Sequence, residues 1–126
     1  MKKHLLLLAV SLFVSLFLSA QAPTAKAVQY GKYGCTASTY KNGYYEFLPK
    51  GSFVLAKGGS YTYLGFSKPS SGTFKVDGAS GVISFRGGYF DKGVATPIEG
   101  KPNRYYLVFP TIAGGRWTCG LTEEKK

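Results

Sequence analysis

Two short stretches determine the fold: residues 33–36, Tyr-Gly-Cys-Thr, and residues 116–120, Arg-Trp-Thr-Cys-Gly, hold the chain's only two cysteines. In an oxidising compartment an even cysteine count favours pairing, and two cysteines allow one intramolecular disulfide. Such a bond between Cys35 and Cys119 would tie the first strand of the domain to its last strand. It would close a loop for which the chain-entropy treatment gives about 4–5 kcal/mol of stabilisation at most.

The aromatic neighbours of the cysteines predict where the core lies. Residues two apart on a strand share a face, so Tyr33 lies beside Cys35 and Trp117 beside Cys119. If the disulfide points inward, Tyr33 and Trp117 anchor the core. A metal site is the weaker interpretation, because two thiolates without a nearby histidine cannot complete a tetrahedral zinc shell.

The start of the chain predicts export. Lys2 and Lys3 precede an apolar run over residues 5–18, which is too short to cross a bilayer of about 30 Å as a helix. Small residues follow, so we expect a signal peptide over residues 1–20, with cleavage as late as Ala27 as the alternative. The mature protein is then secreted, to the exterior or the periplasm, and keeps no transmembrane anchor.

Length and charge limit the organisation of the mature chain. After removal of residues 1–20 from 126, about 106 residues remain, enough for one domain. We expect a loose leader over 21–32, a single β domain over 33–120 and a charged tail over 121–126. Loss of Lys2 and Lys3 leaves 14 Lys+Arg against 6 Asp+Glu, a net charge of +8. That charge favours anionic partners, although scattered lysines that keep a secreted protein soluble explain it equally well.

Aromatic and β-branched residues broken by glycine predict an all-β domain. Asn42-Gly43 is typical of a type I′ hairpin turn, and residues 49–51, Pro-Lys-Gly, suggest a second tight turn. Pro97 suits only an edge strand, because proline cannot donate to a sheet. These signals predict eight or nine strands, at residues 35–40, 44–48, 53–56, 61–64, 73–76, 82–86, 94–98, 105–109 and 116–119.

The strand order favours a small antiparallel meander barrel of about eight strands. A first and last strand joined by a disulfide suit a closed barrel, in which no sheet edge stays exposed. The pattern resembles the up-and-down style of lipocalins and avidins, without the Gly-x-Trp motif that lipocalins carry near their first strand. A two-sheet β-sandwich with an inter-sheet disulfide is the alternative.

The sequence offers no catalytic constellation. The only histidine, His4, lies in the predicted signal peptide, so the mature chain has no imidazole for catalysis or metal binding. Paired cysteines leave no thiolate nucleophile. The spacing of Glu46, Asp91 and Glu99 does not support a glycosidase pair. We therefore expect no enzyme activity, no cofactor and no metal.

The remaining functional expectation is binding. Tyrosine is more abundant than a core of this size needs, and aromatic faces stack on sugars and apolar ligands. Our first hypothesis is a barrel that binds a small apolar or glycan ligand. The alternative is a basic structural or surface-interaction protein that contacts an anionic envelope component or a partner protein. Export argues against nucleic acid as the partner.

The least regular part of the domain, residues 86–104, is the candidate binding surface. Irregular segments on a rigid scaffold often carry function. The basic and aromatic residues proposed for this surface are Arg86, Tyr89, Phe90, Lys92, Lys101 and Arg104.

Overall fold

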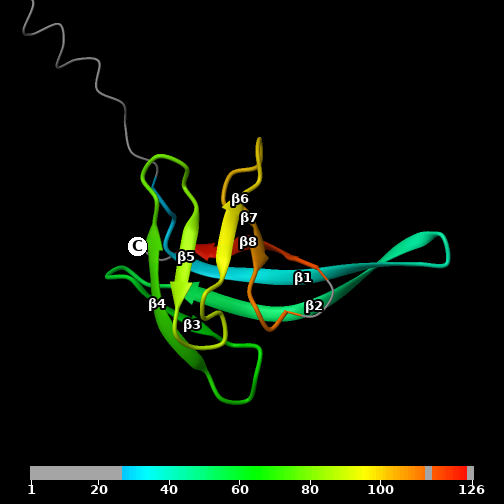
Figure 1. Cartoon of the computed structure of the whole chain (residues 1–126), viewed down its shortest axis with the longest axis horizontal. Coiled ribbons are helices and arrows are strands. Elements are labelled where there is room, and N and C mark those ends of the chain that lie inside the picture. The colour runs from blue at the N-terminus through cyan, green and yellow to red at the C-terminus, as the bar shows by residue number, and fades with distance from the viewer. Residues whose placement is uncertain (1–26, 113–114, 125–126) are drawn as a thin grey trace, which may run out of the picture.

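The computed structural model describes residues 27–112 and 115–124, which form a closed antiparallel barrel (Figure 1). The predicted signal peptide, residues 1–20, lies outside the described residues. The eight strands are β1 (Gly31–Lys41), β2 (Tyr44–Leu55), β3 (Ser60–Tyr63), β4 (Ser70–Val76), β5 (Ile83–Arg86), β6 (Val94–Pro97), β7 (Arg104–Val108) and β8 (Trp117–Glu124). Each strand pairs with the next, and β8 returns to β1. The predicted meander barrel is confirmed, and the sandwich alternative is not.

The predicted disulfide closes this ring. Cys35 on β1 pairs directly with Cys119 on β8 in the sheet register, and their sulfur atoms are bonded at 2.15 Å. Both side chains are buried, so the bond lies on the inner face of the barrel, as expected. In the described part of the chain, no helix is long and apolar enough to cross a membrane.

Aromatic rings fill the barrel interior. Tyr33 stacks on Phe53 with ring centroids 5.3 Å apart, and Tyr61 stacks on Phe90 at 5.4 Å. The buried apolar residues are Tyr33, Cys35, Phe53, Leu55, Tyr61, Tyr63, Phe74, Ile83, Phe85, Phe90, Ala95, Tyr105, Leu107, Phe109, Trp117 and Cys119. A core of so many rings contains little empty space for a ligand, because the rings contact one another.

The turn predicted at residues 49–51 is wrong. β2 continues through this segment, and its register with β1 shifts between Gly34 and Thr36. Lys50 and Gly51 therefore lie opposite the single residue Cys35, which is a β-bulge. Gly51 has a φ of 81°, and a Cβ there would lie 2.7 Å from the Cα of Gly65. The bulge bends the chain without ending the strand, so two predicted strands are one.

The edge strand predicted at residues 94–98 is also wrong. β6 pairs with β5 on one side and with β7 on the other, because the barrel has no edge there. Proline is tolerated because pairing with β5 extends only to Ala95, whereas Pro97 lies opposite Tyr105 of β7 alone. Pro97 has no amide hydrogen, and on the β5 side no strand lies opposite it that such a hydrogen would bond to.

The terminal strands extend beyond the predicted domain limits. β1 begins at Gly31, and Val28 and Tyr30 in front of it pack against the core, although residues 21–32 were expected to be a loose leader. β8 continues through Glu124, so residues 121–124 of the expected tail are part of the barrel wall. Pairing between β1 and β8 explains both extensions, because each end supplies the partner of the other.

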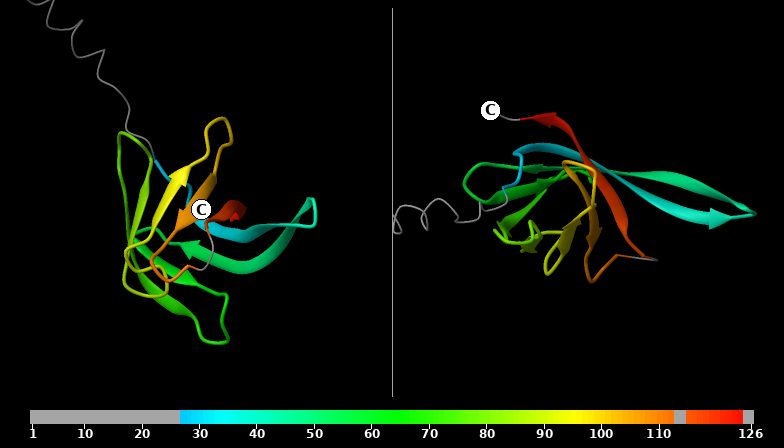
Figure 2. Two further views of the ribbon diagram at one scale, coloured as in Figure 1. Left: turned by 45° about the vertical axis from the view of Figure 1, so that its right-hand side comes forward. Right: turned by 90° about the horizontal axis from the view of Figure 1, so that it is seen from above.

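The β1–β2 hairpin is longer than the barrel is tall and projects from it as an arm (Figures 1 and 2). β8 pairs with β1 only as far as Ala37, and β3 pairs with β2 only from Phe53 onward. We call residues 38–48 the arm. The predicted turn at its tip is confirmed, since Asn42 and Gly43 both have positive φ, at 52° and 87°.

Candidate binding site

The arm presents an aromatic face to solvent. Tyr40 pairs with Tyr45 and Ser38 with Phe47, and residues paired across antiparallel strands share a face. The rings of Tyr40 and Tyr45 lie 5.0 Å apart. Tyr40, Tyr45 and Phe47 are 62%, 63% and 69% exposed. We call these three side chains the aromatic face; none of the paired residues on this face is charged.

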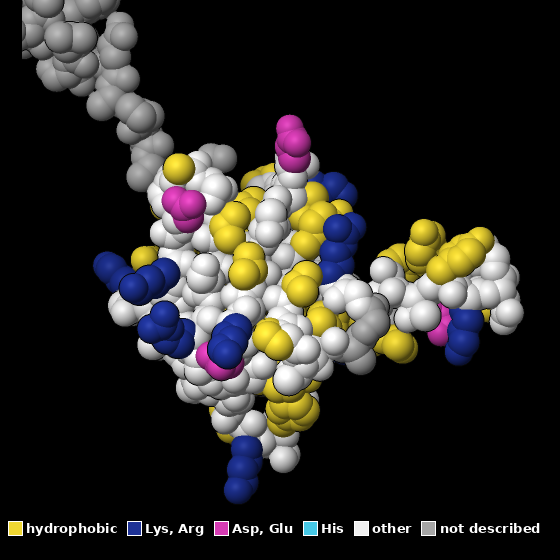
Figure 3. Space-filling view, in the orientation of Figure 1, with side chains coloured by type: hydrophobic (Ala, Val, Ile, Leu, Met, Phe, Trp, Pro, Cys, Tyr) yellow, Lys and Arg dark blue, Asp and Glu magenta, His cyan; other side chains and the backbone are white. Residues whose placement is uncertain are grey.

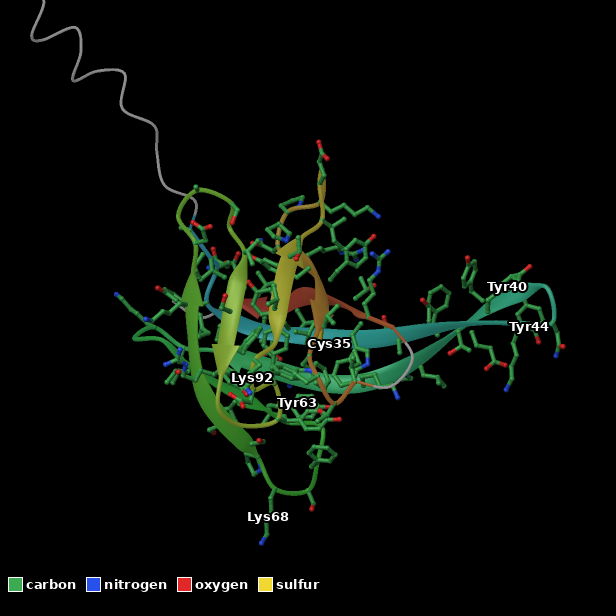
Figure 4. All side chains as sticks on the ribbon, in the orientation of Figure 1. Cys35, Tyr40, Tyr44, Tyr63, Lys68 and Lys92 are labelled. Atoms are coloured by element: carbon green, nitrogen blue, oxygen red, sulfur yellow. A yellow bond between two sulfur atoms is a disulfide. The ribbon has the colours of Figure 1, made fainter. Side chains whose placement is uncertain are left out.

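The opposite face of the arm is mixed in character. Lys41 pairs with Tyr44, and Thr39 with Glu46, so this face carries one cation and one anion. In Figure 3 most apolar side chains of the arm lie on its upper side, and the charged ones lie on its lower side. In Figure 4, Tyr40 and Tyr44 mark the two strands at the arm's tip, far from the core position of Cys35. The two faces of the arm therefore differ: one is uncharged, and the other carries Lys41 and Glu46 beside exposed Tyr44 and Leu48.

Exposed rings on the arm are not explained by folding. The core is complete without them, and large apolar side chains gathered at one exposed place mark interaction sites. The arm also leaves the outer edges of both strands unpaired, at residues 38–41 of β1 and 44–48 of β2. A long exposed apolar hairpin favours association with other chains.

The sequence-proposed surface at residues 86–104 has a different arrangement. Phe90 is fully buried among the core rings, and Tyr89 is half-buried and stacks on Tyr63 at 4.9 Å. The Tyr61 hydroxyl accepts a hydrogen bond from the Phe90 amide at 2.9 Å and donates one to the Gly87 carbonyl. The β5–β6 loop is thereby tied down as a plug at one end of the barrel. Its glycines concealed this role, because they are typical of a free loop.

The basic residues of that surface do not gather in one place. Arg86 and Lys92 lie at the β5–β6 end of the barrel, whereas Lys101 and Arg104 lie at the β6–β7 end. Successive connections of a meander alternate between the two ends, so no single patch includes all four. All four side chains are exposed.

The two residues predicted to anchor the core lie in separate parts of it. Tyr33 packs between Phe53 and Tyr105, with centroid distances of 5.3 and 5.8 Å. Trp117 instead packs against Phe109 at 5.1 Å. The Tyr33 hydroxyl donates to the Gln29 carbonyl at 2.6 Å, which ties the segment before β1 to the barrel.

Ionisable groups in the barrel are structural. Burial raises the pKa of Tyr33, Tyr61, Tyr63 and Tyr105 above the usual value of 10.0, which keeps these phenols protonated. Hydrogen bonds from the Ala79 amide and the Ser80 hydroxyl lower the pKa of Asp77, which shapes the β4–β5 turn. Within residues 27–112 and 115–124, no three His, Cys, Asp or Glu side chains cluster as metal ligands.

The arm was only partly visible in the sequence. The Asn42-Gly43 turn predicted a hairpin, but strands of 35–40 and 44–48 gave no reason to place it outside the barrel. In the structure the arm strands have 11 and 12 residues, whereas β3, β5 and β6 have four each; the predicted strands did not show this difference, because all of them had similar lengths. No family model, curated protein sequence or solved structure matches this chain.

Proposed function

We propose that this chain is an exported, non-enzymatic binding module that holds a glycan against the aromatic face of its arm. The observation that carries the proposal is the exposure of Tyr40, Tyr45 and Phe47 on one uncharged face of a hairpin that projects from a fully packed barrel. Aromatic faces stack on sugar rings, and the tyrosine hydroxyls add hydrogen-bonding groups.

The arm is suited to an extended ligand. Outward residues on one strand are about 6.6–6.8 Å apart, so successive rings line a strip along the hairpin. The type I′ turn at Asn42-Gly43 holds the two strands in register, which arranges the rings before any ligand binds. Prearranged side chains lose less conformational freedom on binding, and this raises affinity.

The packing of the barrel supports an external site. Phe90 occupies the interior, and its ring contacts those of Phe53, Tyr61 and Phe85 at 5.3–5.5 Å. A ligand inside the barrel would have to displace these side chains. Two depressions lie on the outer wall, one between β4 and β5 and one across β7, β8 and β1.

The test is retention of the mature, oxidised protein on neutral polysaccharides such as cellulose, chitin, xylan and β-glucan. The variant Tyr40→Ala/Tyr45→Ala/Phe47→Ala removes the aromatic face. At about 1 kcal/mol for each ring, loss of three rings weakens binding about 100-fold. Because these side chains are exposed, the thermal midpoint should change little.

The matched control is Tyr44→Ala/Leu48→Ala, which removes exposed apolar side chains from the other face of the same arm. The control should keep at least half of the wild-type retention. The proposal fails if wild-type protein is retained by none of these polysaccharides, or if both variants lose binding equally.

A second candidate is contact with an anionic envelope surface. It is favoured by the basic balance expected after removal of residues 1–20, 14 Lys+Arg against 6 Asp+Glu, and by the exposure of Arg86, Lys92, Lys101 and Arg104. Binding of this kind to anionic vesicles falls steeply between low and physiological salt, because exposed charges are screened. Salt-independent binding, or no binding at low salt, would exclude it.

A further inference from the structure

The outer wall across β7, β8 and β1 holds a depression of about 250 Å³ at the base of the arm. The sheet register aligns its outward residues in two neighbouring rows, one of Arg104, Gly120 and Gly34 and the other of Tyr106, Thr118 and Thr36. The buried residues between them, such as Cys119 and Tyr105, face the core. Three threonines, Thr36, Thr118 and Thr122, line the depression, and the Thr122 hydroxyl donates to the Lys32 carbonyl at 3.0 Å.

Two glycines make the floor of the depression. Gly34 and Gly120 lie opposite each other and neither has a positive φ, so the backbone does not require glycine at either position. A Cβ on Gly120 would lie 3.4 Å from Cγ and Nε of Arg104, and one on Gly34 would lie 3.4 Å from Cγ2 of Thr122. Glycine inside a strand often marks a place where a ligand approaches the backbone closely.

Two guanidinium groups lie beside these rows. The Arg116 guanidinium lies 3.6 Å over the ring of Tyr106, and a stacked arginine is held in a defined orientation. The Arg104 side chain runs alongside Gly120. No acidic side chain of the described residues lines the depression. Guanidinium groups, together with the hydroxyls of Thr36 and Thr118, suit an oxyanion where no carboxylate competes.

We propose that this depression binds the carboxylate or phosphate group of an acidic sugar. The site continues the outward face of β1 onto the arm, where Tyr40 follows Thr36 by four residues, or about 13 Å. One glycan chain would thus place an acidic unit at Arg104 and Arg116 and its neutral units on the aromatic face. In this respect the inference rests on the proposed function and extends it to acidic glycans.

The test is a ¹H–¹⁵N NMR titration of the mature, oxidised protein at constant ionic strength. The probes are glucuronate for a carboxylate, glucose 6-phosphate for a phosphate, and glucose as the neutral sugar. At least one acidic probe should shift the Nε–Hε signals of Arg104 and Arg116 and the amide signal of Thr118 in a saturable way. The probe that binds more tightly identifies which oxyanion the site takes.

Two variants test the site itself. Arg104→Gln should weaken binding of the acidic probe about tenfold or more, because a charge-assisted hydrogen bond is lost. Gly120→Ala keeps every charge but raises the floor beneath Arg104, and it should weaken binding severalfold. Lys75→Gln is the matched control: it removes one positive charge from an exposed position on β4 and should leave binding unchanged.

Three outcomes would overturn the inference: shifts with glucose equal to those with the acidic probes, no shifts with either acidic probe at millimolar concentration, or an equal effect of Lys75→Gln and Arg104→Gln. If neither acidic probe binds but neutral polysaccharides retain the protein, the inference about the depression is refuted and the proposed function of the arm is supported. Saturable acidic-sugar binding by a protein that no neutral polysaccharide retains would support the depression and refute the arm.

Discussion

At the scale of single residues, the cysteines connect strands that already pair. Cys35 and Cys119 lie opposite each other on β1 and β8, at a sequence separation of 84. The bond therefore adds no new neighbour to the folded protein; in the chain-entropy treatment it acts by restricting the unfolded chain.

We predict that Cys35→Ser lowers the free energy of unfolding by about 4 kcal/mol, because the closed loop is long. Urea denaturation of the oxidised wild type and the variant measures this change, and alkylation should label Cys119 in the variant alone. The double variant Cys35→Ala/Cys119→Ala is the control for the buried serine. A wild-type protein that carries two alkylatable thiols would refute the prediction.

The Tyr61 hydroxyl is the polar group that ties the β5–β6 plug to the wall. It bonds to the Gly87 carbonyl and to the Phe90 amide, while its ring stacks on Phe90. Removing the hydroxyl leaves two backbone groups of the plug without this partner.

We predict that Tyr61→Phe lowers the free energy of unfolding by about 1–3 kcal/mol, the cost of unsatisfied polar groups in a buried setting. Hydrogen exchange should show faster exchange of the Phe90 amide. Tyr44→Phe, on the exposed arm, is the control and should change stability by less than about 0.5 kcal/mol. Equal stabilities of the two variants would contradict this role for Tyr61.

At the scale of elements, the arm and the barrel are separable. The arm strands pair with each other, whereas the barrel strands are joined through β8 and β3 at residues outside the arm. Ala37 and Leu48 form the same kind of pair as Lys41 and Tyr44, because four residues separate the two positions and pair types alternate along the ladder.

We predict that the arm can be deleted without loss of the barrel. Removing residues 38–41 and 44–47 joins Ala37 to Leu48 through the same Asn-Gly turn and keeps the register. Stability should change by about 1 kcal/mol or less, because the deleted side chains are exposed or half-buried and outside the core, and polysaccharide retention should disappear. Unfolding of this variant, measured by near-UV circular dichroism, would show that the arm supports the barrel.

At the scale of the whole molecule, the core is unusually rich in phenols. Tyr33, Tyr61, Tyr63 and Tyr105 are all buried, and burial raises the pKa of each above 10.0. In the unfolded chain the same groups ionise near pH 10. Above that pH the unfolded state binds fewer protons than the folded state, so raising the pH favours unfolding.

We predict that the contribution of these four tyrosines to stability is complete below about pH 10 and is lost as the pH rises through their raised folded values. Urea midpoints measured between about pH 8 and about pH 12 should fall in the upper part of this range. Tyr105→Phe removes one of the ionisable groups and should make the fall shallower. A midpoint that stays constant to about pH 12 would contradict the prediction.

Much of the fold could be predicted from local chemistry. Two cysteines allow one intramolecular disulfide, Asn42-Gly43 specifies a hairpin turn, and glycine-broken aromatic runs specify a meander. Each of these features depends on residues close in sequence or, for the disulfide, on the one pairing that two cysteines allow. The residues 49–51, by contrast, look like a turn locally but form a bulge, because β1 continues to pair with β2 on both sides of them.

The sequence by itself determined the all-β class, the disulfide and the meander, because short-range backbone preferences and a single possible cysteine pairing decide them. Only the tertiary structure decided that the arm lies outside the barrel, that Phe90 plugs the interior and that Arg104 lines a depression on the outer wall. These features depend on where neighbouring strands end and on which rows the register aligns, and those are relations between residues far apart in the chain.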